Sequence, residues 1–296
     1  MPRSESGSSS RAPDGQDEYA AGLQVTILGS GTLLPDDEHR SAAHLVEGPG
    51  FGLLWDCGSG TVHGMERYGV RWRELSHLAI SHFHTDHFGD LPALMWALKH
   101  GVGEERDHAL TILGPRGLRR RLTLLAEAYG PFILDPGFPV DVVEFEAEDD
   151  WADGDAGLRL RAHPARHTPE ALAFRIDAGA LAVGYTGDTG HLPLLGPFFQ
   201  GVDLLIAECA LADDSGAEAH LTPTGVASLL RDADPQLTVL THLYPEVERA
   251  ALPDLIRGLG YTGDVLVGHD GLSIRIRPGQ TPLSAVDGSD RTPDRQ

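Results

Sequence analysis

The segment His82-Phe83-His84-Thr85-Asp86-His87 holds the densest group of potential metal ligands in the sequence. It contains three imidazoles and one carboxylate, and both kinds of group bind Zn²⁺ and similar divalent ions. If the first part of the segment is extended, His82 and His84 point the same way, and Asp86 and His87 can turn toward a second ion. The alternative is a solvated histidine-rich turn, but four potential ligands in one loop favour a metal site.

Three further polar residues follow apolar, strand-like segments. His167 comes after residues 158–163, Asp188 lies in a Thr-Gly-Asp-Thr turn after residues 181–185, and His242 follows residues 237–241. A polar residue on a turn after a buried strand is well placed to act as a ligand. Each of the three could instead cap or solvate its own turn, but together with the histidine-rich segment they indicate one composite site.

Short apolar strands alternate with helical stretches along most of the chain. The pattern predicts strands over 24–28, 43–47, 52–56, 77–81, 109–113, 140–144, 158–163, 172–176, 181–185, 204–207, 237–241, 264–267 and 272–276. It predicts helices over 61–68, 90–99, 115–129, 222–232 and 245–258, and Thr222-Pro223 is a typical helix start. Two mixed sheets packed face to face, with helices outside, satisfy this α/β pattern.

The 296 residues, 41% of them hydrophobic, are enough for one domain with a substantial core. We expect this domain over residues 22–278, between disordered tails at 1–21 and 279–296 that are rich in small and polar residues. The sequence has no apolar run of 18 residues and no secretory leader, so we expect no membrane association. Cys57 and Cys209 are expected to be buried free thiols in a reducing cytoplasm.

The chain is strongly acidic, with 23 Lys and Arg against 44 Asp and Glu and a formal net charge of −21. Proteins that bind nucleic acids normally carry a basic patch that displaces counterions from phosphates. This charge argues against a long polyanion as substrate, but it leaves a small phosphate ester open, because bound metal ions would add positive charge that the formal count omits.

The ordered set of motifs resembles the metallo-β-lactamase fold superfamily, and in particular its branch of ribonuclease Z and small phosphodiesterases. The family's His-x-His-x-Asp-His motif corresponds to residues 82–87, and the resemblance extends from about residue 22 to 277. It implies a four-layer αββα sandwich with two divalent metal ions, Zn²⁺ or alternatively Mn²⁺. By the same resemblance, the ligands of one ion are His82, His84 and His167, those of the other are Asp86, His87 and His242, and Asp188 bridges both.

A metal pair of this kind can clamp an in-line displacement by a bridging hydroxide, which Asp86 would help to orient. The leaving group also needs an acid, and ribonuclease Z-like proteins use a histidine in a short His-x-Thr element. His220, in His220-Leu221-Thr222, matches that element, and Glu208 could orient it. A capping role for His220 and a structural hydrogen bond for Glu208 remain the alternatives.

The sequence departs from ribonuclease Z at two points. The usual short form carries a long Gly/Pro-rich arm that grips tRNA, but here only 21 residues separate His167 from Asp188 (188 − 167 = 21). The final histidine is followed by Leu-Tyr-Pro and not by Ser-x-Arg-Tyr. Both departures favour a small, cyclic or linear phosphodiester over long nucleic acid.

Three other functions stay open at this point. A lactone or thioester hydrolase would use the same dinuclear site, a ribonuclease Z-type endonuclease would have to act without the arm, and a metal-binding sensor would not catalyse at all. Dimers are common among similar proteins, so a homodimer is also an expectation of the resemblance, although no residue indicates one.

Overall fold

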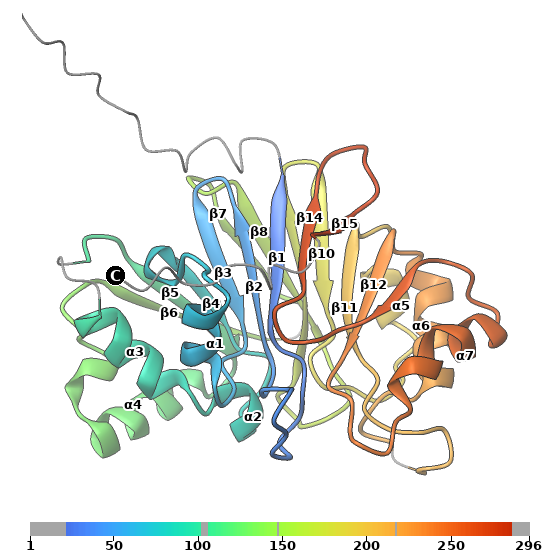
Figure 1. Ribbon diagram of the computed structural model, residues 1–296. Coiled ribbons are helices and arrows are strands. Elements are labelled where there is room, and N and C mark those ends of the chain that lie inside the picture. The colour runs from blue at the N-terminus through green and yellow to red at the C-terminus, as the bar shows by residue number, and fades with distance from the viewer. Residues whose placement is uncertain (1–21, 102–105, 147, 217, 286–296) are drawn as a thin grey trace, which may run out of the picture.

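Two β-sheets form the centre of the molecule (Figure 1). The computed structural model describes residues 22–101, 106–146, 148–216 and 218–285. The first sheet has the strand order β15-β14-β1-β2-β3-β4-β5-β6 and the second the order β13-β12-β11-β10-β9-β8-β7. Each sheet contains a parallel run, β3 to β6 in the first and β10 to β13 in the second.

The strands of the first sheet are β1 (Leu23–Gly29), β2 (Ala43–Gly48), β3 (Phe51–Trp55), β4 (His77–Ala79), β5 (Leu110–Pro115), β6 (Val140–Phe145), β14 (Ser273–Ile276) and β15 (Leu283–Ala285). The strands of the second are β7 (Asp150–Asp153), β8 (Leu158–Pro164), β9 (Leu172–Ala178), β10 (Leu181–Tyr185), β11 (Leu204–Glu208), β12 (Leu237–Thr241) and β13 (Val265–Val267).

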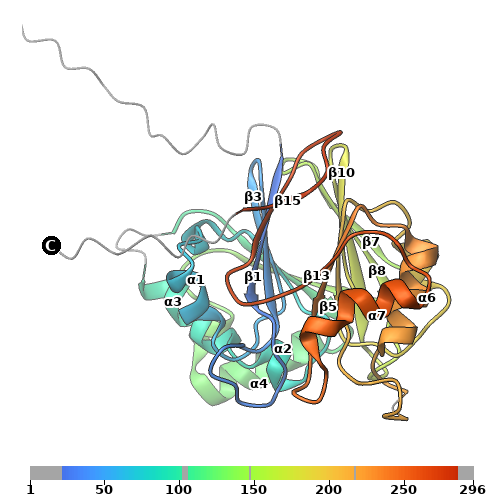
Figure 2. The same cartoon turned by 45° about the vertical axis from the view of Figure 1, so that its right-hand side comes forward.

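Helices cover the outer face of each sheet (Figures 1 and 2). Those of the first half are α1 (Thr61–Arg67), α2 (Thr85–Phe88), α3 (Leu91–His100) and α4 (Leu118–Tyr129), and those of the second are α5 (Leu195–Phe198), α6 (Pro223–Ala233) and α7 (Leu252–Gly258). The arrangement confirms the predicted αββα sandwich. None of the helices in the described part of the chain is long and apolar enough to cross a membrane.

Three apolar cores hold the layers together, one between the sheets and one under each helical layer. Neighbouring residues of β3 show why: Leu53 packs between the sheets, whereas Leu54 packs beneath the helices. Because successive side chains of a strand point to opposite faces, a strand covered on both faces is apolar throughout. The same burial encloses Cys57 and Cys209, which are free thiols as predicted.

Several element boundaries differ from the predicted ones. The helix predicted over 245–258 begins only at Leu252, after a 3₁₀ turn at Arg249–Ala251, because the chain first turns back through a bond from Val247 N to Tyr244 O. Pro115 ends β5 and does not start α4, whose first turn follows the left-handed Gly117. The strand β15 pairs with β14 beyond the expected domain boundary at residue 278, while the expected tails 1–21 and 286–296 lie outside the described residues.

The core between the sheets makes a testable contribution to stability. Leu204 in β11 is fully buried there, whereas Leu194, before α5, is 62% exposed. We expect Leu204→Ala to lower the free energy of unfolding by about 2–5 kcal/mol, because it leaves a cavity among packed side chains. Leu194→Ala should change it by less than about 0.5 kcal/mol. Urea unfolding of the metal-free proteins measures both, and equal losses would contradict the assignment of the core.

Candidate metal centre

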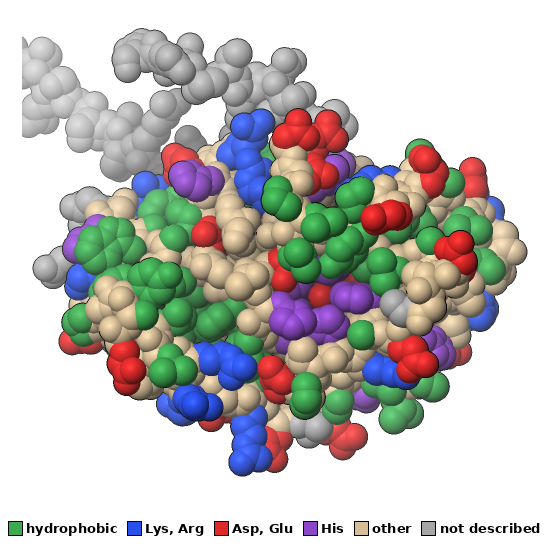
Figure 3. Space-filling view, turned by 90° about the horizontal axis from the view of Figure 1, so that it is seen from below, with side chains coloured by type: hydrophobic (Ala, Val, Ile, Leu, Met, Phe, Trp, Pro, Cys, Tyr) green, Lys and Arg blue, Asp and Glu red, His purple; other side chains and the backbone are tan. Residues whose placement is uncertain are grey.

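The candidate ligands lie at strand ends from both sheets. The loop after β4 carries His82 and His84, the turn after β10 carries Asp188, and His242 directly follows β12. Parallel strands place their carboxyl ends at the same edge of a sheet, so their following loops converge. Viewed onto this edge of the molecule, histidine side chains gather at the centre of the face, beside acidic and hydrophobic ones (Figure 3).

The local conformation of the histidine-rich loop separates its ligands into two groups. His84 is extended and forms the N-cap of α2, and Asp86 and His87 lie within that one-turn helix. The imidazole of His82 and the side chains of Asp86 and His87 are buried, whereas His84 is exposed. The chain thus changes from extended to helical between His84 and Asp86, while the rings of His82 and His87 stay close, with their centroids 4.2 Å apart.

Several overlapping groups of ligand atoms lie close together, and two trios among them correspond to the sets that the resemblance implies. His82, His84 and His167 form one trio, and Asp86, His87 and His242 form the other; the ligand atoms of each trio lie within 4.8 Å of one another. The Nε2 atom of His167 is 3.0 Å from Nδ1 of His84, and Nε2 of His242 is 3.3 Å from Oδ2 of Asp86. The structure therefore brings together the residues that the resemblance assigns to each ion.

Asp188 lies between the two trios. Its carboxylate oxygens are 3.3 Å from Nε2 of His87, 3.4 Å from that of His242, 3.7 Å from that of His167 and 3.9 Å from that of His82. A single carboxylate thus faces imidazoles from both groups. This is the position that a bridging ligand needs.

The donor atoms fit divalent metal ions. Two atoms bound to one tetrahedral Zn²⁺ ion lie about 3.4 Å apart, which is within the range of the distances given above. The Nε2 atom of His82 is buried and has no hydrogen-bond partner among the described residues. Buried polar atoms are almost always paired, so an unpaired imidazole nitrogen that faces a carboxylate suits a cation.

The electrostatics of the cluster favour positive charge at its centre. Burial alone would raise the pKa of Asp188, but the imidazoles of His242 and His87 hold it well below its usual range. Burial lowers the pKa of His82, which keeps this imidazole neutral. Burial also disfavours a charged His87, yet Asp188 and Asp56 raise its pKa well above the ordinary value. The carboxylates therefore stabilise positive charge at this point, and a metal ion supplies such charge.

Asp56 is a site residue that the sequence analysis missed. It follows β3, is fully buried, and accepts a hydrogen bond of 2.7 Å from Nδ1 of His87. A carboxylate behind a ligand histidine fixes the ring and leaves Nε2 free to bind metal. Asp56 also has a left-handed backbone, with φ of 57°, as does His242. Its position directly after an apolar strand was the available signal.

His220 and Glu208 form a pair at the edge of the ligand cluster. Nδ1 of His220 lies 3.1 and 3.2 Å from the two carboxylate oxygens of Glu208, which is almost completely buried. Burial opposes the charged imidazole, but the bond to Glu208 raises the pKa of His220 above its ordinary value. The His220 ring centroid is 4.8 Å from that of His167 and 5.7 Å from that of His242. The His220 imidazole thus lies beside both ligand groups.

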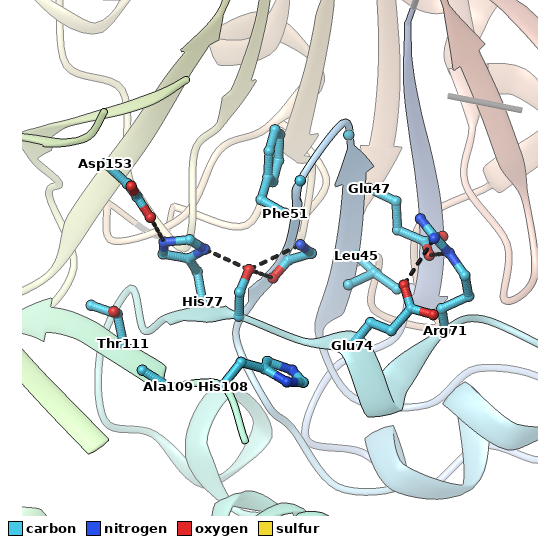
Figure 4. A pocket seen from close by; sticks show the side chains of 14 residues that line it. Leu45, Glu47, Phe51, Arg71, Glu74, His77, His108, Ala109, Thr111 and Asp153 are labelled. Atoms are coloured by element: carbon cyan, nitrogen blue, oxygen red, sulfur yellow. Dashed lines mark hydrogen bonds and ion pairs between the residues drawn. The ribbon is translucent and has the colours of Figure 1, made fainter. Parts of the chain in front are cut away.

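A second polar pocket, of about 440 Å³, lies at the opposite edge of the first sheet (Figure 4). His77 begins β4, whereas His82 follows its end. In the pocket, Nδ1 of His77 lies 2.8 Å from the hydroxyl of Ser76, which directly precedes β4. Its Nε2 lies 3.3 Å from Oδ2 of Asp153, in β7 of the second sheet. All the metal-type clusters found among the described residues belong to the centre described above, so this pocket links the sheets without adding to it.

Comparisons with known proteins agree with this geometry. The family described as "Beta-lactamase superfamily domain" matches residues 53–243. A ribonuclease Z of Haloferax volcanii is 29% identical over 308 aligned positions, which cover 86% of this chain and 95% of that protein.

Two solved structures show the same fold. The metallo-β-lactamase fold protein YhfI of Bacillus subtilis superposes with a TM-score of 0.74 at 23% identity, over 86% of this chain and 99% of YhfI. The short form of human tRNase Z superposes with a TM-score of 0.67 at 21% identity, over 88% of this chain and all of that one. At these identities the likeness establishes the architecture and leaves the substrate open.

The position of Asp188 between the trios predicts the effect of removing it. Asp188→Ala should lose at least one metal ion per chain, because a carboxylate shared by both groups is the ligand whose loss affects both. Elemental analysis of the purified protein after dialysis measures the metal content, and Asp153→Ala, at the opposite edge of the sheet, is the control. An Asp188→Ala protein with the full metal content of the wild type would rule out the bridging role.

Proposed function

Because the chain belongs to the β-lactamase superfamily and is a metal-dependent hydrolase, we propose that it hydrolyses small phosphodiesters, including cyclic ones. The observation that carries this proposal is the His220–Glu208 pair beside the ligand cluster. When a phosphodiester is cleaved, the leaving group is an alkoxide, and this strongly basic oxygen needs a proton. In this proposal the pair supplies that proton to the leaving oxygen.

We assign the proposed ligands to two metal ions. His82, His84 and His167 would hold one ion, Asp86, His87 and His242 the other, and Asp188 both; Zn²⁺ suits this set of imidazoles and carboxylates, with Mn²⁺ as the alternative. When bound, two such ions would acidify water near neutral pH and neutralise the negative charge of a reacting phosphate. Asp86 is also placed to accept a hydrogen bond from the attacking water.

The protein's own proton donor is His220. Its Nδ1–H donates to Glu208, which is held in turn by the backbone N–H groups of Thr189 and Ala210. With Nδ1 engaged, Nε2 is the ring nitrogen that can face the substrate and transfer a proton to the leaving oxygen. Glu208 therefore orients the ring and stabilises its protonated form.

The short connection between His167 and Asp188 supports a small substrate. After the turn that follows His167, the hairpin of β9 and β10 accounts for residues 172–185, and β10 ends three residues before Asp188. Two strands of the second sheet thus make up most of this connection, and it contains no inserted arm. The net charge of −21 also disfavours a long polyanion.

A ribonuclease Z-type activity is the second candidate, because relatives with that name align over most of this chain. The alignment with the Haloferax volcanii protein has 308 positions, whereas 86% of 296 residues is about 255, so about 50 positions face gaps in this chain. That relative therefore carries additional residues. Cleavage of a precursor tRNA would favour this second function over the first.

A substrate screen of the metal-loaded protein tests the proposal. We expect turnover of bis(p-nitrophenyl) phosphate and of cyclic nucleotides, loss of turnover with a chelator, and recovery with Zn²⁺ or Mn²⁺. The rate of product release is the measurement. Turnover of acyl lactones without any phosphodiester turnover would overturn the proposal in favour of a lactonase.

The role of His220 can be separated from metal binding by the choice of leaving group. His220→Gln should lower kcat by about 10²–10⁴-fold for a phosphodiester with an alkoxide leaving group, since this group needs a proton. With a p-nitrophenolate leaving group, which is weakly basic, the loss should be much smaller. His269→Gln, in an exposed turn, is the control. Equal losses with both substrates would mean that His220 is not the acid.

A further inference from the structure

The carboxylate of Asp56, next to the candidate metal centre, accepts four hydrogen bonds. Its Oδ1 accepts from the backbone N–H of Ser81 at 2.7 Å. Its Oδ2 accepts from the Ser81 hydroxyl at 2.7 Å, the Tyr185 hydroxyl at 2.6 Å and Nδ1 of His87 at 2.7 Å. Asp56 is fully buried, and these donors satisfy the hydrogen-bonding capacity that its carboxylate would otherwise lose on leaving water.

These bonds also fix which ring nitrogens carry protons. His87 donates from Nδ1 to Asp56, so in the neutral form that a metal ligand requires its Nε2 keeps a lone pair toward the centre. Ser81 has one hydroxyl proton, which goes to Asp56, and therefore its oxygen accepts from Nδ1 of His82 at 3.1 Å. His82 then also presents an unprotonated Nε2. A single carboxylate thus sets the tautomer of one ligand in each trio.

Tyr185 is the donor to Asp56 that comes from the other sheet. Asp56 follows β3 of the first sheet, and Tyr185 ends β10 of the second, so this bond crosses the sandwich beneath the centre. The ring of Tyr185 is enclosed, stacked on Trp55 at 5.6 Å and edge-on to His44 at 4.9 Å. These neighbours hold the ring in the orientation in which its hydroxyl donates to Asp56.

We propose that Tyr185 is a positioning residue of the metal centre: its hydroxyl holds the Asp56 carboxylate that orients His87 and, through Ser81, His82. This inference rests on the proposed metal site. The hydrogen bond of the hydroxyl goes to Asp56, so in this proposal its effect reaches the ligands through that carboxylate. Without it, the carboxylate loses one of its three donors at Oδ2 and holds the two imidazoles less firmly.

The test is a Tyr185→Phe variant, which removes one oxygen and keeps the ring. We expect its affinity for Zn²⁺ to fall by about 10–100-fold, the usual effect of losing a group that supports metal ligands. Competition with a chromophoric chelator, starting from the metal-free protein, gives this affinity without any activity assay.

The matched control is Tyr261→Phe. Tyr261 is also buried, and its hydroxyl donates to Pro235 O at 3.3 Å, within the helical layer of the second half. We expect Tyr261→Phe and Tyr185→Phe to lower the free energy of unfolding in urea by similar amounts. The affinity of Tyr261→Phe for Zn²⁺ should equal that of the wild type. Equal Zn²⁺ affinities of the two variants would overturn the inference.

A double-mutant cycle with Asp56→Asn tests the route of the effect. If Tyr185 acts through Asp56, the double variant should bind Zn²⁺ about as weakly as Asp56→Asn alone; multiplied losses would overturn the proposal. In ¹⁵N-histidine NMR spectra of the Zn²⁺-loaded protein, Tyr185→Phe should change the Nδ1–H signals of His82 and His87. If the wild type itself bound no metal, the proposed function would fail; with wild-type binding intact, only the role of Tyr185 is at stake.

Discussion

Two buried carboxylates, Asp56 and Asp188, are the constraint on which the rest of this site depends. An ionised carboxylate removed from water is very costly unless donors or cations surround it. Asp56 accepts four hydrogen bonds from three residues, whereas Asp188 faces imidazoles at 3.3–3.9 Å. The two carboxylates therefore differ in their surroundings: hydrogen-bond donors surround one, and imidazoles that suit a shared cation surround the other.

The sandwich meets this requirement because two parallel runs of strands end at one edge. β3 and β4 bring Asp56 and the histidine-rich loop from one sheet, and β10 and β12 bring Asp188 and His242 from the other. Two of the four non-glycine residues with positive φ among the described residues, Asp56 and His242, lie at this edge. Such conformations cost on the order of 1–3 kcal/mol each for residues with a side chain, and the packed sheets on either side maintain them.

The sequence predicted the layers and the parts of the site that are dense or repeated in type. Strands covered on both faces are apolar throughout, and several histidines and aspartates follow such strands, so both features are visible without a structure. Asp56 and Tyr185 were missed because each is one polar residue at the end of an ordinary strand, and their contact joins residues 129 positions apart. The helix expected from residue 245 began late because a turn at Tyr244 to Val247 comes first, and nothing in its periodicity shows that turn.

The same reasoning separates the chemistry of the centre from the choice of substrate. The candidate ligands follow strand ends inside the sandwich. Replacing one of them would leave a buried charged group without its partner, so these positions tolerate little substitution. The connections between them lie at the surface, where insertions cost little. In this chain the connection from His167 to Asp188 consists mostly of the β9–β10 hairpin of the second sheet. A longer connection at this point could contact a large substrate, whereas the short one in this chain is an argument for the small ester of the proposed function.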